Sequence, residues 1–106
     1  MSFNKIFIVG HVGREPRIEV SSKGSFICYL AVATNEVIKQ EKITTWYQVV
    51  LFGNQAERAK HQLTKGAKVY VEGRLRPQQM KDKEGKVRTV LEIAADEFCS
   101  LTSITK

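Results

Sequence analysis

Hydrophobic and polar residues alternate along most of the chain, and the alternation predicts five β-strands. The predicted strands, the first of which is interrupted, cover residues 3–12 with 18–20, 25–34, 44–53, 68–75 and 87–101. β-Branched and aromatic residues are frequent in them, as is typical of half-buried strands. Residues 21–24 have the composition of a tight turn, which predicts a hairpin. Residues 35–43 (NEVIKQEKI) are charged without a clear period and predict a solvated loop.

The stretch TTWYQVVLFG, residues 44–53, is largely apolar on both faces of its predicted strand. Alternation divides its side chains between one face with Tyr47, Val49 and Leu51 and another with Trp46, Gln48, Val50 and Phe52. The first face supplies a core. The second then needs a cover, which is the rest of the chain, another subunit or a ligand.

After Gly53 the apolar residues change to helical spacing. Asn54 and Glu57 have the spacing of an N-cap and capping box, and Gly66 suits the C′ position, which predicts a helix of about three turns. Three strands, a helix and two strands form the order typical of an all-β OB-fold, a five-stranded Greek-key barrel. Another small β-barrel with an inserted helix fits the periodicity nearly as well.

The length and the charge of the chain narrow its class. The 106 residues suffice for one domain, residues 1–106, and the net charge of +6 favours a polyanionic partner, first of all nucleic acid. The apolar runs IFIV and VVLF are far shorter than the roughly 20 residues of a membrane-spanning helix. The N-terminus does not resemble a secretory signal, and two cysteines without a CxxC motif predict reduced thiols. We therefore expect a cytoplasmic protein.

Catalytic chemistry has little support in the sequence. The candidate metal ligands are scattered along the chain at His11, Cys28, His61 and Cys99. Neither GxxxxGK[ST] nor GxGxxG occurs, so no phosphate loop is predicted. Asp96 and Glu97 are adjacent in a predicted strand and point to opposite faces, which argues against a paired acid and base. We expect no metal, no cofactor and no enzymatic activity.

Basic residues concentrate in the predicted hairpin between the last two strands. Six of them stand there against two acidic residues, Asp82 and Glu84: Arg74, Arg76, Lys81, Lys83, Lys86 and Arg88. One interpretation is a solvated hairpin whose charges keep a sheet edge from pairing. The other is an arm that follows a phosphate backbone, aided by Lys5, Arg14, Arg17 and Lys65.

Two aromatic residues favour the second interpretation. Trp46 and Phe52 lie on one face of their predicted strand. Bases of a single strand stack on flat side chains whatever the sequence. The alternative is that Trp46 is a core residue, as many aromatic residues are.

Four segments carry a resemblance to a known family. They are NKIFIVGHVGREP (4–16), TTWYQVVLFGNQAE (44–57), KGAKVYVEGRLR (65–76) and EIAADEF (92–98). With them, nearly the whole chain resembles bacterial single-stranded DNA-binding proteins. The resemblance implies an OB-fold that assembles into a homotetramer. It also implies a nucleoid-associated protein that binds single-stranded DNA in replication, recombination and repair, through aromatic stacking and contacts from lysine and arginine.

The resemblance also implies roles for individual residues. The implied DNA-binding positions include Trp46, Phe52, Lys65, Arg74 and Arg76, together with the hairpin beyond them.

Other positions bear on affinity and assembly. Ile38 and Met80 stand where many members of the family have tryptophan, so they are expected to make only apolar contact with DNA. Tyr70 lies in a strand that packs subunits together in the family, and Tyr47 replaces a histidine near a subunit interface. We expect fewer stacking platforms than in most members.

The end of the sequence leaves alternatives open. Family members usually continue into a flexible linker and an acidic tip that recruits enzymes, whereas SLTSITK ends at Lys106. If the chain naturally ends there, no recruitment through a tail is expected. A second hypothesis is a dimeric accessory protein of primosome type that acts mainly as an interaction platform, with DNA binding secondary. Chromosomal, plasmid or phage origin, and preference for DNA or RNA, stay open.

Overall fold

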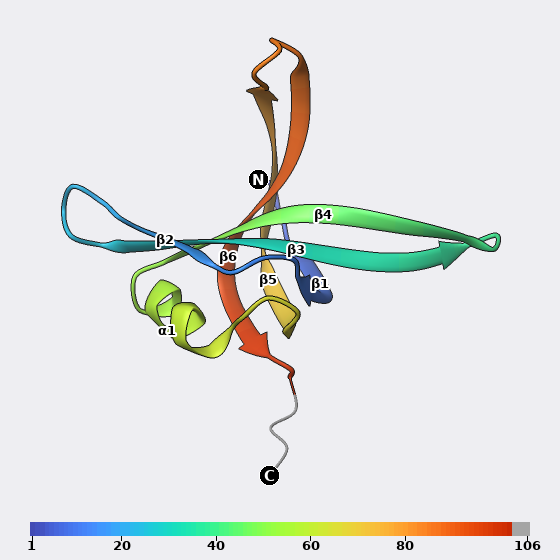
Figure 1. Ribbon diagram of the computed structural model, residues 1–106. Helices are drawn as coiled ribbons and strands as arrows, with labels where there is room; N and C mark the ends of the chain where they lie inside the picture. The colour runs from blue at the N-terminus through green and yellow to red at the C-terminus, as the bar shows by residue number, and fades with distance from the viewer. Residues whose placement is uncertain (103–106) are drawn as a thin grey trace.

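The computed structural model describes residues 1–102, which form a β-barrel with one helix (Figure 1). The elements are β1 (Ile6–Val12), β2 (Arg17–Val20), β3 (Phe26–Ile38), β4 (Glu41–Phe52), α1 (Asn54–Gln62), β5 (Lys68–Lys81) and β6 (Val87–Ser100). Their order in the sheet is β1-β5-β6-β4-β3-β2, and a further pairing of β1 with β3 closes five strands into a barrel. The expected architecture is confirmed. The expectation about the chain end at Lys106 lies outside the described residues.

The predicted first strand is divided into two elements. The chain bends at residues 13–16, so β1 and β2 are separate strands and the helix follows β4. β1 pairs with β5 along Ile6–His11, but with β3 only at His11 and Val12. Among the described residues, the second edge of β1 therefore has no strand partner before His11.

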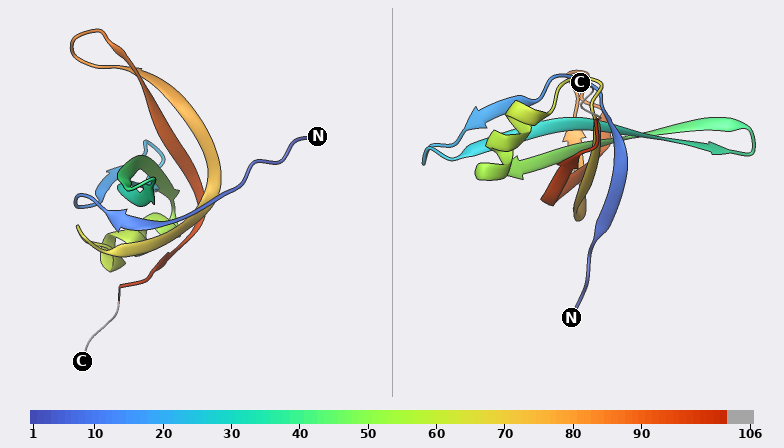
Figure 2. Two further views of the ribbon diagram at one scale, coloured as in Figure 1. Left: turned by 90° about the vertical axis from the view of Figure 1, so that its right-hand side faces the viewer. Right: turned by 90° about the horizontal axis from the view of Figure 1, so that it is seen from below.

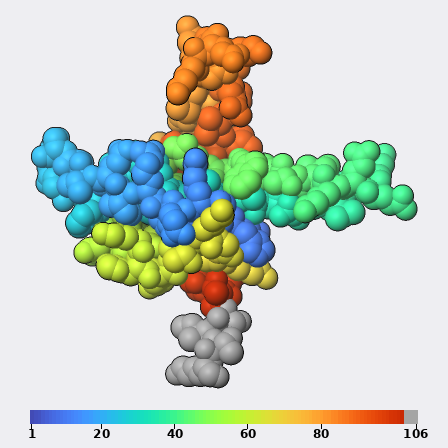
Figure 3. Space-filling model, in the orientation of Figure 1, coloured from blue at the N-terminus to red at the C-terminus, as the bar shows by residue number. Residues whose placement is uncertain are grey.

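The prediction of a solvated loop over residues 35–43 is wrong. β3 and β4 stay paired as far as Ile38 and Glu41, and only Lys39 and Gln40 lie between them. Both residues have positive φ, 52° and 68°, as a two-residue type I′ hairpin turn requires. The turn lacks the asparagine and glycine that usually mark this type. The hairpin forms an arm, the β3–β4 arm, that projects from the barrel (Figures 1 and 3).

β5 also continues further than the alternation predicted. It runs to Lys81 instead of ending near Leu75, and it stays paired with β6 up to Val87. The result is a second projecting hairpin, the β5–β6 arm, which leaves the barrel in a different direction from the first (Figures 1 and 2).

The helix differs from its prediction at both ends. It begins after Gly53, and no side chain caps its first turn, so the predicted capping box of Asn54 and Glu57 does not form. It ends at Gln62 with Leu63 as C-cap. Gly66 lies in the following turn at φ 92°, where its N–H donates to the carbonyl oxygen of Val12 at 2.7 Å. The helix is therefore shorter than predicted. Within residues 1–102, no helix is long and apolar enough to cross a membrane.

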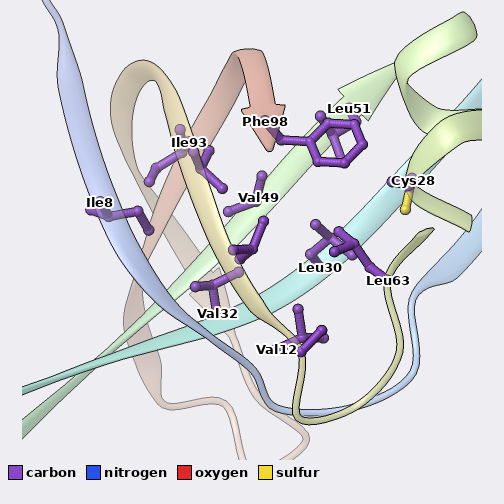
Figure 4. Packing of buried hydrophobic residues seen from close by; sticks show 14 of the residues in the cluster. Ile8, Val12, Cys28, Leu30, Val32, Val49, Leu51, Leu63, Ile93 and Phe98 are labelled. Carbon is purple, nitrogen blue, oxygen red and sulfur yellow. The ribbon is translucent and has the colours of Figure 1, made fainter. Parts of the chain in front are cut away.

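Aliphatic side chains from every barrel strand fill the interior (Figure 4). Leu30, Val49, Leu51 and Ile93 are at most 1% exposed. α1 adds Ala56 and Ala59 to the same core, and its C-cap residue adds Leu63. Burial of this kind stabilises a fold by roughly 1.5 to 3 kcal/mol for each large side chain. The barrel has its own core, so its outer faces are available for other contacts.

The two faces of β4 differ in exposure, as the alternation of its residues predicted. Trp46 and Phe52 are 55% and 59% exposed, whereas Val49 and Leu51 on the opposite face are fully buried. The predicted division of faces is confirmed. Val50 lies on the same face as Trp46 but is only 6% exposed, because it pairs with Tyr29 of β3 on one side and with Ala94 of β6 on the other.

Candidate nucleic-acid interface

A groove of about 560 Å³ lies where β4 and β6 separate. These strands pair in parallel only along Gln48–Val50 and Glu92–Ala94. Before that point each strand belongs to its own arm, and Figure 3 shows the two arms leaving the barrel separately. The loop between β1 and β2 contributes Gly13 and Arg14 to the groove. Three segments that are distant in sequence therefore line one surface.

The groove brings six of the predicted residues together. They come from the β1–β2 loop, β4 and the β5–β6 arm, and they are Arg14, Trp46, Tyr47, Met80, Lys81 and Arg88. Arginine and lysine supply positive charge, and the tryptophan supplies a flat ring. This combination suits a chain of phosphates and bases.

Trp46 is positioned by Gly13, which lies in the loop between β1 and β2. A Cβ atom on Gly13 would lie 2.4 and 2.5 Å from Cζ3 and Cη2 of the indole ring. The Gly13 N–H also donates to the carbonyl oxygen of Ala31 at 2.8 Å, which fixes the loop beside β3. The indole thus rests against backbone while more than half of its surface stays exposed. Sequence alone gives no signal of this contact, because Gly13 and Trp46 are far apart in the chain.

The β5–β6 arm carries exposed basic side chains both at the groove and beyond it. Lys81, Lys83, Lys86 and Arg88 are all exposed. The salt bridges found among residues 1–102 involve only Lys5 and Arg17 as basic partners, so none of these four is neutralised by one. The carboxylate of Asp82 accepts the N–H groups of Glu84 and Lys86, both at 2.9 Å, and orders the tip of the arm.

Four predicted residues lie outside the groove but remain exposed. Phe52 is at the end of β4, on the face of Trp46. Lys65 follows α1, and its backbone N–H donates to the Glu15 carboxylate at 2.9 Å. Arg74 and Arg76 are exposed on β5, near the base of the arm.

Two further predicted residues are not brought to the groove. The Nζ atom of Lys5 lies 3.1 Å from a carboxylate oxygen of Glu72 and 3.4 Å from one of Asp96. The hydrogen bond with Glu72 raises the pKa of Lys5, whose charge is compensated in this position. Ile38 pairs with Glu41, five residues along β3 from the partner of Trp46, so alternation places it on the opposite face of the β3–β4 arm.

The two tyrosines predicted at subunit interfaces have different surroundings. Tyr70 stacks with Phe7 at 6.4 Å between ring centroids, on an outer face of β1 and β5. Phe7 and Val9 on this face are 59% and 48% exposed. Tyr47 packs partly against the core and lines the groove.

The thiols and acidic groups do not assemble into a metal site within residues 1–102. No group of three or more potential ligands is found in this part of the chain. Cys28 and Cys99 are both free. Burial raises the pKa of the Cys28 thiol to about 11, so it stays protonated at neutral pH and is a poor nucleophile.

Comparisons with known proteins agree with this arrangement. A family profile described as the single-strand binding protein family matches residues 3–101. Single-stranded DNA-binding proteins of Neisseria meningitidis serogroups A and B are each 33% identical over 103 residues, which cover 92% of this chain. The chain spans 59% of the length of these relatives.

A solved structure supports the same family. The chain is similar to a structure described as a Plasmodium falciparum SSB complex with ssDNA, with a TM-score of 0.81 and 26% identity. The similarity covers 95% of this chain and 96% of the other. The OB-fold and the resemblance inferred from the sequence are confirmed. Proteins of this family are non-enzymatic, which confirms that no catalysis is to be expected.

The contact between Gly13 and Trp46 generates a prediction. Gly13→Ala adds a methyl group inside contact distance of the indole, so the ring must move. We expect altered tryptophan emission and near-ultraviolet circular dichroism, measured on the folded protein without ligand. Gly24→Ala is the control: its Cβ meets no atom within 4 Å, so strain at its positive φ lowers stability without moving the ring. Spectra of Gly13→Ala identical to the wild type would contradict the contact.

Proposed function

We propose that this chain, which belongs to the single-strand binding protein family, coats single-stranded DNA in the cytoplasm without sequence preference. The coat protects DNA exposed in replication, recombination and repair. The observation that carries the proposal is the groove in which exposed Trp46 lies beside Arg14, Lys81 and Arg88.

Each group of the groove has a role in this binding. A base stacks on the exposed indole of Trp46, and the arginine and lysine side chains contact phosphates on either side. Every base has a π-face, so stacking is independent of sequence. Met80 adds apolar contact from the β5–β6 arm. Phe52 is a second stacking position at the end of β4.

The same groove discriminates against duplex DNA. Bases in a duplex are stacked on one another and paired, so their faces cannot reach the indole of Trp46. A duplex would meet only the basic side chains of the arm, such as Lys83 and Lys86, through its phosphates. Binding of duplex is then weak and more sensitive to salt than the stacked complex.

We also propose that the chain assembles into a homotetramer. Two features support subunit contacts away from the groove. One is the apolar surface formed by Phe7, Val9 and Tyr70 on the outer face of β1 and β5. The other is the edge of β1 before His11, which has unpaired backbone groups that a second chain can use.

Removing the stacking platform tests the groove. We predict that Trp46→Ala weakens binding of a dT oligomer by about 1 to 3 kcal/mol, the range for one stacked base. A labelled oligomer measures the affinity by anisotropy, and Trp46→Phe, which keeps a ring, is the matched control. Thermal melting should show that both variants stay folded. Unchanged affinity of Trp46→Ala would place the binding site elsewhere.

Neutralising the arm tests the phosphate contacts. Replacing Lys81, Lys83 and Lys86 by Gln should flatten the salt dependence, because each phosphate contact contributes about 0.7 to the log–log slope for single strands. We expect the slope to fall by about 2 if all three contact phosphates. A control with Gln at exposed Lys23, Lys60 and Lys68, outside the arm, should keep the original slope. An unchanged slope in the arm variant would make the arm a solvated hairpin.

Assembly is tested by mass in solution. We predict a wild-type species of about 48 kDa in analytical ultracentrifugation, four times the 12.0 kDa chain. Val9→Glu places a charge in the apolar surface and should give a smaller, folded species. Val20→Glu, at a 60% exposed position on β2, should leave the mass unchanged. A wild-type dimer would instead favour the accessory interaction platform.

A further inference from the structure

A second groove adjoins the one that contains Trp46. It has a volume of about 350 Å³ and is lined in part by Arg17 and Tyr29. Arg14, Ala31 and Gln48 line both grooves, so the two are continuous.

Strand register places the second groove on the same outer face as Trp46. Tyr29 pairs with Val50 of β4 and with Arg17 of β2. Paired residues lie on the same face of a sheet, and Val50 lies on the same face as Trp46 because the two are four residues apart. Along the strand, four residues correspond to about 13 Å between Val50 and Trp46. Tyr29 thus lies between the two exposed aromatic residues of β4, since Phe52 is two residues beyond Val50.

Arg17 covers the ring of Tyr29. Its guanidinium carbon lies 4.3 Å from the ring centroid, the geometry of a cation–π contact. Arg17 also forms a salt bridge with Glu19, which partly compensates its charge. The side chain is 61% exposed. The guanidinium is therefore a planar group that lies on an aromatic ring and has an accessible surface.

We propose that Arg17 stacked on Tyr29 is a further base-stacking site for single-stranded DNA. The strand leaves Trp46, crosses Ala31 and Gln48, and places a base on the guanidinium plane. This rests on the proposed function and extends it to a second site. Guanidinium planes accept unstacked bases as aromatic rings do.

The surrounding charges favour a base over a phosphate at this site. Glu19 pairs with Arg17, and Glu15 lines the same groove. Both carboxylates would repel a phosphate placed against the guanidinium. Arg14 lies at the junction of the two grooves and supplies the phosphate contact there. The role of Arg17 is therefore stacking, whereas its charge alone suggested a phosphate contact.

The test removes both planar groups and keeps the charge. The double variant Arg17→Lys with Tyr29→Leu should bind a labelled dT oligomer roughly 5- to 150-fold more weakly than the wild type, the loss of one stacked base. On an abasic oligomer of equal length, wild type and variant should bind alike. Arg58→Lys is the control. The guanidinium carbon of Arg58, on α1, lies 4.8 Å from the ring centroid of Phe98, and Arg58 lines neither groove.

Each other outcome overturns the proposal in a recognisable way. Wild-type affinity of the double variant for dT means that no base stacks at Arg17. An equal loss on dT and on the abasic oligomer means that the site contacts the phosphate backbone. Circular dichroism confirms that the variant is folded. Failure of the wild type to bind any single strand would overturn the proposed function itself, and this site with it.

Discussion

The arms and the groove depend on one short parallel pairing, between Gln48–Val50 of β4 and Glu92–Ala94 of β6. Strands that pair in parallel over a few residues and then diverge leave backbone and side chains of both uncovered. Here the two strands continue into separate antiparallel hairpins that project in different directions. β4 pairs with β3 in one hairpin, and β6 pairs with β5 in the other. The buried core residues do not line the groove, which is formed by exposed and half-buried side chains.

Positions in front of the junction combine two kinds of group that rarely meet in a core. Trp46 is held against the backbone at Gly13 and exposes a flat ring, while Arg14 and Arg88 stand beside it. Stacking accepts any base, and phosphate contacts carry no sequence information because the backbone is the same at every nucleotide. A protein that uses both coats a strand wherever its bases are exposed. Specificity is then for the single-stranded state.

Much of the fold follows from the alternation of side chains, because a strand with one buried face has little freedom in its register. The faces of β4 and the helix after it were predictable for that reason. Residues 35–43 were not, since Lys39 and Gln40 adopt left-handed conformations without glycine or asparagine. Their hairpin turns Ile38 away from Trp46, a consequence that the resemblance did not reveal.

The candidate site was predictable in its residue types and less so in its geometry. A lone tryptophan and a basic hairpin indicated nucleic acid. Three contacts could not be read from the residue types: Gly13 with Trp46, Arg17 with Tyr29, and Lys5 with Glu72. The first and third join segments that are distant in the sequence, and the second depends on the register of the β2–β3 hairpin. Lys5, which its charge alone suggested as a DNA contact, pairs with Glu72 instead.

Stacking of bases on Trp46 can be tested directly, because Trp46 is the only tryptophan in the sequence. The intrinsic fluorescence of the protein is followed during titration with oligo-dT and with a duplex of equal length, each at low and high salt. If bases stack on the indole, the single strand should quench its fluorescence strongly, and the duplex should quench it little at either salt concentration. Binding of the single strand without quenching would contradict stacking on Trp46, because the bases would then lie elsewhere on the protein.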